Sequence, residues 1–429
     1  MPTITLHLHT PLRRTFRVLQ VAGLFDVPLA EQISHELTAE VPGLGEEWTI
    51  GAIVGPSGSG KTTLARAAFG GVHEPPPWAA GEAIIDGLGD APLKEIARVL
   101  TAVGLGSVPT WLKPYQVLST GERFRADVAR AILKVPSSKF KVQSCDSNPT
   151  LNLEPRTVNS STILVLDEFT STLDRVVACT ASAAIARLLR SGSQARRLVV
   201  LTCHADILPW LAPDWVLDLG QSPPRLARGR LRRPTLRLEI RRVAQAFWPA
   251  FARHHYLSGG LASSATCWGA FASTEVQGSK FNVQSGDAVP TLNFEPGTWN
   301  SNLPIAICAV VAAFGWRGRK RITRLVTLPE FQGLGIGPRL AEAVATHERS
   351  RGNRVTITAS HPAIVAHCAR SPRWQYAGLK KTGSTRQRHG QRAIACSTGR
   401  AVASFEFVGS GGGEGEGARE REGEAMSNR

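Results

Sequence analysis

The sequence predicts an α/β protein with two domains, and three observations lead to this expectation. The length of 429 residues is sufficient for two domains with ordinary hydrophobic cores. An apolar strand, a glycine-rich loop and a helix-forming run follow one another twice, with loops that begin at Gly55 and Gln332. Two nearly identical strings, Ser138–Ser160 and Ser279–Ser301, interrupt otherwise regular patterns and stand too far apart to stack as a repeat protein.

Composition limits the environment of the protein. No apolar run reaches the roughly 18 to 20 residues that cross a bilayer, the best being Ile305–Phe314, and no signal region follows Met1. The cysteines form no CxxC pair and stand in mostly apolar settings, which predicts reduced, buried thiols. They are Cys145, Cys179, Cys203, Cys267, Cys308, Cys368 and Cys396. We therefore expect a cytoplasmic protein without a membrane span.

Positive charge is concentrated in one segment. The formal net charge is +16, and arginine is dense between Arg225 and Arg242. Such a segment is typical either of contact with an acidic partner, such as nucleic acid, or of a solvated basic linker. Both interpretations stay open from the sequence.

The first glycine-rich loop predicts a nucleotide site. The short strand Ile50–Val54 leads into GPSGSGKTT, and a helix-forming run starts at Leu64, which is the GxxxxGK[ST] phosphate loop in its strand-loop-helix setting. The backbone amides of this loop would surround the β-phosphate, Lys61 would reach the β- and γ-phosphates, and Thr62 would ligate Mg²⁺. The predicted ATP-binding residues here are Gly55, Ser57, Gly58, Ser59, Gly60, Lys61, Thr62 and Thr63.

A second apolar strand, ILVLDE, starts at Ile163 and ends in two carboxylates. Asp167 suits a magnesium ligand, and Glu168 suits the base that polarises the attacking water. An apolar strand that ends in acids is common, so this pattern is weak by itself.

Three further motifs specify the nucleotide site. LSTGE opens an amphipathic helix at Leu118, STLD ends at Asp174, and His204 ends the strand LVVLTCH. In this order the motifs resemble an ABC-type ATPase. The resemblance implies that Ser119 and Gly121 complete the ATP site of the opposite subunit, that Asp174 belongs to the ATP site and that His204 senses the γ-phosphate. It therefore implies an ATP-dependent, head-to-tail homodimer.

The chain also departs from the pattern of that family. Thr120 and Glu122 replace a glycine and the glutamine of LSGGQ, and Phe169 replaces the proline after the acidic pair. No Q-loop glutamine stands between Lys61 and Ser119, which argues against a permease partner and against a transporter ATPase, the third alternative. Phe16 or Phe25 is an adenine-stacking candidate, but we expect an aromatic residue of an N-terminal strand to lie in the core.

The repeated strings explain a gap in the first domain. The first copy fills the turn between the signature helix and the acidic strand, and its Asn-Pro, Glu-Pro and Asn-Ser pairs favour a surface loop. We hypothesise that both copies descend from one repeated DNA element that entered two tolerant hairpins and carries no chemistry. A paired recognition module is the alternative.

The second glycine-rich loop predicts a different site. The strand RITRLVTL, the loop QGLGIG, a helix and the strand VTITAS follow one another. This order resembles the GNAT acetyltransferases, whose loop amides bind the pyrophosphate of acetyl-CoA at a helix N-terminus. A glycine-rich turn beside an ordinary helix is the alternative. The predicted acetyl-CoA-binding residues are Gln332, Gly333, Gly335, Ile336 and Gly337.

Acyl transfer needs a base for the acceptor and an acid for the leaving thiolate. We expect Glu330, Tyr256 and Tyr376 to be the catalytic residues. His255, Ser360 and His361 are weaker candidates, and the adjacent His254 and His255 diverge too far on a helix to share a metal ion.

Together the halves resemble an ABC-type ATPase fused to a predicted GNAT acetyltransferase domain. That resemblance predicts a P-loop ABC-type ATPase domain followed by a GNAT-like α+β acyltransferase domain, with ATP, Mg²⁺ and acetyl-CoA as ligands. The acyl acceptor would be associated with nucleic acid, whereas a nucleic-acid-binding ATPase with a non-catalytic GNAT domain is the first alternative. The expected parts are residues 1–220 (ATPase), 221–245 (basic linker), 246–408 (acyltransferase) and 409–429 (disordered tail), with insertions at 137–161 and 277–303.

Overall fold

The chain forms two compact units in the computed structural model. The structure describes residues 2–11, 13–28, 32–134, 163–191, 196–231, 233–255, 260–275, 303–313, 315–382 and 400–409. The first unit comprises Met1–Leu238, Ala272–Ser301 and Pro329–Leu334, and the second comprises Glu239–Phe271, Asn302–Leu328 and Gly335–Arg429. Both repeated strings and the tail beyond residue 409 lie outside the described residues, so the predictions about them stay predictions.

The first unit is built on a five-stranded sheet in the order β4-β5-β3-β6-β7. Its strands are β3 (Ile50–Val54), β4 (Ile163–Leu166), β5 (Arg197–Thr202), β6 (Trp215–Asp218) and β7 (Arg225–Arg228). β3, β4, β5 and β6 are parallel, and β7 is antiparallel to β6. The predicted strands at Ile50 and Ile163 are confirmed. Parallel strands buried on both faces favour continuous apolar runs, which both segments have.

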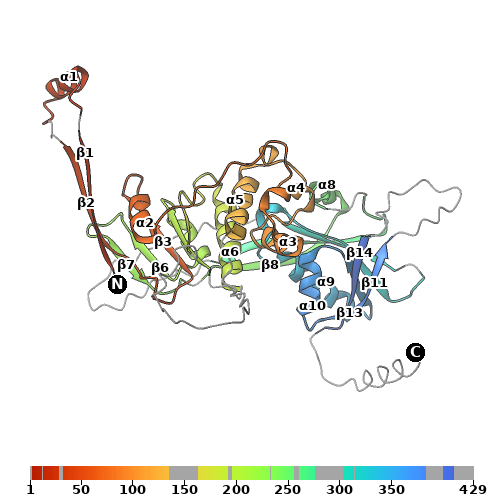
Figure 1. The fold of residues 1–429 in the computed structure, drawn as a ribbon. Coiled ribbons are helices and arrows are strands. Elements are labelled where there is room, and N and C mark those ends of the chain that lie inside the picture. The colour runs from red at the N-terminus through yellow and green to blue at the C-terminus, as the bar shows by residue number, and fades with distance from the viewer. Residues whose placement is uncertain are drawn as a thin grey trace, which may run out of the picture. The chain divides into compact units, whose positions relative to one another are not determined.

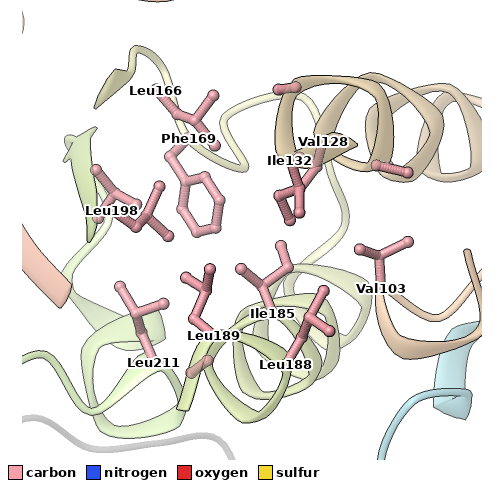
Figure 2. Packing of buried hydrophobic residues seen from close by; sticks show 14 of the residues in the cluster. Val103, Val128, Ile132, Leu166, Phe169, Ile185, Leu188, Leu189, Leu198 and Leu211 are labelled. Carbon is pink, nitrogen blue, oxygen red and sulfur yellow. The ribbon is translucent and has the colours of Figure 1, made fainter. Parts of the chain in front are cut away.

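Helices cover this sheet. The longer ones are α2 (Lys61–Phe69), α3 (Leu93–Ala102), α5 (Thr120–Lys134) and α6 (Arg175–Ser191). The shorter ones are η1 (Asp86–Leu88), α4 (Val108–Trp111), η2 (Tyr115–Val117), η4 (Ala205–Ile207) and α7 (Leu208–Leu211). Figure 2 shows Ile132 of α5 and Ile185 of α6 on facing sides of one apolar cluster, with Leu166 and Phe169 beside them. The amphipathic helix predicted after LSTGE is therefore confirmed as α5.

A hairpin carries the first helix of the chain. β1 (Thr3–Pro11) pairs with β2 (Gln32–Glu40) in antiparallel register, and α1 (Phe16–Phe25) connects their outer ends (Figure 1). Phe16 and Phe25 lie on this helix and are exposed. The expectation that they belong to a strand and pack in the core is wrong, because the two strands of the hairpin end on either side of them.

The second unit is built on a seven-stranded sheet in the order β13-β14-β12-β11-β10-β9-β8. Its strands are β8 (Thr235–Val243), β9 (Thr266–Glu275), β10 (Ala306–Ala312), β11 (Arg319–Thr327), β12 (Arg354–Ala359), β13 (Trp374–Thr382) and β14 (Arg400–Phe407). β11 and β12 are parallel, whereas β9 and β10 form the predicted antiparallel pair. The helices of this unit are η5 (Gln245–Phe247), α8 (Trp248–Ala252), α9 (Ile336–Ser350) and α10 (Pro362–Arg370), whereas η6 (Pro329–Phe331) belongs to the first unit.

Three further observations concern the basic linker, the cysteines and the length of the helices. The range predicted as a basic linker contains all of β7 and β8, and the chain passes from one unit to the other within β8. Of the five cysteines that the structure describes, four are buried, but Cys203 is exposed, which corrects the expectation for that residue. Among the described residues, none of the helices has the length and apolar character that crossing a bilayer requires.

Candidate functional site

The phosphate loop stands between the end of β3 and the start of α2. Gly58 (φ +78°) and Gly60 (φ +86°) adopt the left-handed conformation that other residues seldom tolerate. Gly60 is also the N-cap residue of α2, and no side chain caps that helix. The N-terminal amides of α2 therefore lack an internal side-chain acceptor, as a phosphate site at a helix N-terminus requires.

Side chains of the loop fit a phosphate group. The Lys61 ammonium donates to the carbonyl oxygens of Gly55 (3.0 Å) and Pro56 (2.7 Å), so it is folded back over the loop. The Ser59 hydroxyl oxygen is buried and has no hydrogen-bond partner within the described part of the chain. A buried, unsatisfied hydroxyl is costly, and a phosphate oxygen would satisfy it.

The two predicted magnesium ligands meet at one point. The Thr62 hydroxyl donates to Asp167 Oδ2 across 2.7 Å, although the residues are 105 positions apart. Hydroxyl and carboxylate oxygens are ligands that Mg²⁺ accepts, with water and substrate phosphates completing its shell. Within the described residues no group of three or more His, Cys, Asp or Glu side chains gathers as a metal site. The residues therefore fit a magnesium ion that is bound together with a nucleotide.

The acidic strand ends in an unusual backbone. Glu168 (φ +45°) and Thr170 (φ +64°) both have positive φ, which costs energy for residues other than glycine. Phe169 anchors the turn between them: its amide donates to the Leu201 carbonyl (2.9 Å), and its buried ring packs edge-on against Phe124. The exposed Glu168 carboxylate is thus held out from the sheet beside Asp167.

Sheet register brings these residues to one edge. Val54 is opposite Thr202, and Leu166 is opposite Val200, so the carboxyl ends of β3, β4 and β5 meet. His204 follows β5 by two residues at that edge, and its backbone amide donates to the Thr202 hydroxyl (3.0 Å). The edge at the carboxyl ends is where open α/β sheets bind ligands.

The signature segment forms a cap at the start of α5. The Ser119 amide and hydroxyl both donate to Glu122 Oε2 (3.0 Å each), and the Glu122 amide donates back to the Ser119 hydroxyl (3.3 Å). This reciprocal pair is a capping box. Glu122 therefore occupies the N-terminus of α5 with its own negative charge. Gly121 follows in the first turn, and Asp174 similarly caps α6 through the Val177 amide (3.0 Å).

Sequence reasoning missed the contacts of residues 329–334, which belong to the first unit. The buried Arg125 of α5 donates to the carbonyl oxygens of Pro329 (2.7 Å) and Glu330 (3.4 Å). Burial lowers the pKa of Arg125 to about 10, against the opposing effect of the Glu330, Glu122 and Asp174 carboxylates. The sequence does contain a signal for this burial. Arg125 stands three and four positions before the apolar Val128 and Ala129, so helical spacing places it on the same buried face of α5.

Gln332 and Gly333 also contact other parts of the first unit. The Gln332 side-chain oxygen accepts from the Gly106 amide (2.5 Å). A Cβ atom on Gly333 would lie 2.6 Å from the Ala184 Cβ and 2.7 Å from the Ala102 carbonyl oxygen. Glycine at this position therefore has a packing reason that is independent of any ligand.

The rest of the predicted acetyl-CoA loop starts α9 in the second unit. Gly335 (φ +78°) is the N-cap residue, and no side chain caps the helix. Ile336 is buried, so only its backbone is available to a ligand. A Cβ on Gly337 would lie 3.2 Å from the Thr327 hydroxyl, so this glycine lets α9 pack on the end of β11. Pro338 carries no amide hydrogen, which removes one donor from the first turn.

The parallel pair in the second unit separates beside this helix. β11 pairs with β12 only from Arg319 to Ile322, although β11 continues to Thr327 and β12 continues two residues beyond Ile357. Backbone groups after Ile322 therefore have no partner in β12. Such a strand edge accepts an extended ligand through main-chain hydrogen bonds.

The predicted acyl-transfer residues are scattered. Glu330 is exposed in the first unit, and Tyr376 is exposed on β13 of the second unit, with its ring 5.7 Å from that of Phe405. Tyr256 lies outside the described residues. The weaker candidates have structural roles: His361 caps α10 through the Ala363 amide (3.3 Å), and the His255 ring packs against Trp248. Ser360 directly follows β12.

Comparisons with known proteins give partial matches. No protein-family model matches the sequence, and no curated protein matches it. The chain is similar to the solved structure of cbiO1 from Clostridium perfringens, part of the ABC transporter complex cbiONQ, with 17% identity over 40% of this chain and 74% of that chain and a TM-score of 0.29. It is also similar to the dimeric bacterial ABC transporter cassette MJ0796, with 14% identity over 46% of this chain and 93% of that chain and a TM-score of 0.32.

The second half has a separate match. A Bacillus subtilis acetyltransferase in complex with CoA shares 9% identity over 40% of this chain and 98% of that chain, with a TM-score of 0.23. Because all three TM-scores are below 0.5, the fold class rests on strand order and on the places of the motifs. On those grounds the first unit is an α/β unit with its phosphate loop between β3 and α2, and the second is an α+β unit with a glycine-rich loop at the start of α9, in agreement with the fold class that the sequence predicts.

Proposed function

We propose that the protein is a cytoplasmic ATPase of ABC type whose ATP-dependent homodimer controls acetyl transfer by its GNAT-like unit. In this proposal ATP and acetyl-CoA are the substrates, and the acceptor is associated with nucleic acid. A permease partner has no role in it.

ATP binding is supported by the edge at the carboxyl ends of β3, β4 and β5. The loop amides, Ser59 and Lys61 would hold the phosphates, and Thr62 and Asp167 would hold Mg²⁺, which neutralises charge on the phosphates. The exposed Glu168 would take a proton from the water that attacks the γ-phosphate, and His204 lies at the same edge. Ser119 and Gly121 are exposed or half-exposed at a helix start, as residues that serve a second subunit must be.

Acyl-CoA binding is supported by the start of α9 and the end of β11. The uncapped amides at Gly335 to Gly337 suit a pyrophosphate, and the unpaired edge after Ile322 suits the amide groups of an extended pantetheine chain. Glu330, Tyr256 and Tyr376 stay the proposed acid and base residues.

The observation that carries the coupling is the position of Arg125. α5 begins with the signature residues Ser119 to Gly121, and one turn later Arg125 binds the carbonyl oxygens of Pro329 and Glu330. These residues lead directly into Gly335 and α9. A shift of α5 when ATP binds at its N-terminus would therefore move the loop that precedes the acyl-CoA site.

This coupling is tested by isothermal titration of CoA with and without ATP. The titration uses the Glu168→Gln variant, which we expect to retain bound ATP long enough to reach equilibrium. We expect ATP to change the affinity for CoA, and CoA to change the affinity for ATP by the same factor, because linkage is reciprocal. Equal CoA affinities with and without ATP would refute the coupling.

One observation favours a second candidate function, a nucleic-acid-binding ATPase with a non-catalytic GNAT unit. Two of the predicted acetyl-CoA residues already have contacts within the first unit: Gln332 accepts a hydrogen bond from the Gly106 amide, and Gly333 packs against Ala184. If these contacts within the first unit are their only role, CoA binds weakly or not at all. The same titration separates this candidate, because it predicts ATP binding without CoA binding.

A further inference from the structure

Arginine side chains gather at the edge of the first unit's sheet that is opposite to the nucleotide edge. β3, β5 and β6 begin there, and the antiparallel β7 ends there, with Arg228 opposite Trp215. We call this set the arginine edge. It consists of Arg187 and Arg190 of α6, Arg197 of β5, Arg228 of β7, and Arg230 and Arg233, which follow β7.

Within the described residues, Asp214 and Glu46 pair with members of this set, and both carboxylates are already shared. Asp214 Oδ1 accepts from Arg190 (3.0 Å), while its Oδ2 accepts from the amides of Thr49 (2.8 Å) and Ile50 (2.9 Å). Glu46 Oε2 accepts from Arg228 (2.6 Å), while its Oε1 accepts from the Gly43 amide (2.7 Å). Their acceptor atoms are thus committed to backbone amides as well as to arginines, and positive charge is in excess.

Arg233 has two donor atoms without an acceptor. Its Nε and Nη2 atoms are enclosed, and neither has a hydrogen-bond partner in the described part of the chain. Burial, together with the positive charges of Arg190, Arg230 and Arg187, lowers the pKa of Arg233 to about 10. A half-buried guanidinium beside like charges, with two enclosed donor atoms that lack an acceptor, destabilises the folded state, and a bound anion would relieve this.

The Nε–Nη2 side of Arg233, although enclosed in this structure, has the geometry of an oxyanion site. In the second unit Arg354 uses the same two atoms, Nε and Nη2, to bind both oxygens of Glu406 at 2.6 Å and 2.8 Å. This side-on arrangement matches carboxylate and phosphate groups equally well. The neighbouring Arg187 and Arg230 are exposed, so a ligand with charge repeated along its length can meet them together with Arg233.

We propose that the arginine edge binds the phosphate backbone of a nucleic acid. Arg233 turns its enclosed Nε–Nη2 side outward to donate two hydrogen bonds to one phosphate, and Arg187 and Arg230 contact the neighbouring phosphates. A polyanion fits better than an isolated anion because several arginines share one surface and the formal net charge of the chain is +16. The proposal names a nucleic-acid contact for the proposed function, but it requires neither ATP hydrolysis nor acyl transfer, so the two can fail separately.

The test is binding of a fluorescein-labelled DNA duplex of about 20 base pairs to the full-length chain, without ATP or CoA, at several salt concentrations. The variants are Arg233→Ala and the double variant Arg187→Ala/Arg230→Ala. Arg321→Ala is the matched control, because Arg321 is an exposed arginine of the second unit and its loss changes the net charge equally. We expect Arg233→Ala to weaken binding about tenfold or more and to lower the salt slope by about 1, with little change for the control.

Thermal unfolding supplies a second readout. Arg233→Met removes an unpaired buried charge, so we expect the melting temperature without DNA to stay the same or rise, and the stabilisation by DNA to shrink. The proposal is overturned if Arg233→Ala and Arg321→Ala weaken binding equally, which would indicate only a solvated basic surface. It is also overturned if Arg233→Met unfolds far below the native chain, or if inorganic phosphate stabilises the chain while DNA does not bind.

Discussion

Replacing Arg125 by methionine tests whether α5 positions the loop before α9. The side chain is 2% exposed and donates to the Pro329 carbonyl at 2.7 Å and, more weakly, to the Glu330 carbonyl at 3.4 Å. Hydrogen bonds from charged groups contribute about 1.5 to 3 kcal/mol, so one strong and one weak bond stabilise the ordered loop by about 2 kcal/mol. That free energy corresponds to a factor of about 30 in the population of the ordered loop.

We therefore expect Arg125→Met to weaken CoA binding, measured by isothermal titration, by about 30-fold when loop order is required for binding. The melting temperature should change little, because methionine fills a similar volume and needs no desolvation of charge. Arg130→Met is the matched control: Arg130 is also buried on α5, but its acceptors are the carbonyls of Pro76 and Pro77. CoA binding that is unchanged in Arg125→Met, or weakened as much in Arg130→Met, would refute the reasoning.

Three other predictions concern the nucleotide site and the second unit. Glu168→Gln should retain ATP and elute as a dimer in gel filtration with ATP, and a monomer under those conditions would contradict the dimeric ATP site. Glu122→Gln removes the negative charge that caps α5, so it should tighten ATP-dependent dimerisation by several-fold; weaker dimerisation would show that the capping box is needed in the dimer. Burial alone would raise the pKa of Glu342, but hydrogen bonds from His367, Arg373 and Ser371 outweigh it and lower that pKa. A lowered pKa stabilises the fold above the unfolded value near pH 4 and loses that effect as the pH falls through the folded value. Glu342→Gln should therefore lower stability by about 1 to 3 kcal/mol at pH 7 and flatten the acid limb of a melting-temperature profile; an unchanged limb would contradict this role.

The phosphate loop could be predicted because its information is local. Glycines at fixed spacing, a strand before them and a lysine after them specify the backbone of Gly55 to Gly60 whatever surrounds it. The acidic strand and the helix after LSTGE are also local patterns. Sheet register then follows from packing apolar strands side by side, which brings Asp167 within 2.7 Å of Thr62.

Other features depend on contacts between distant parts of the chain. Arg125 binds a carbonyl 204 positions away, and Gln332 binds an amide 226 positions away, so neither partner is visible in a local pattern. The same limit affects the glycines of QGLGIG. Gly333 and Gly335 both have positive φ, and Gly333 and Gly337 also pack closely against Ala184 and Thr327. The spacing of the motif does not reveal these packing contacts.

The central claim is that ATP controls acetyl transfer, and the direct measurement is transfer of labelled acetyl from acetyl-CoA with and without ATP. The acceptors are DNA, transfer RNA, cell protein extract and small amines, and Gly335→Glu is the blank, because a carboxylate at the N-cap of α9 would repel the pyrophosphate. The account predicts ATP-dependent label on one class of acceptor and none with the blank. Equal labelling with and without ATP would contradict the account. No label on any acceptor, while ATP is hydrolysed normally, would also contradict it.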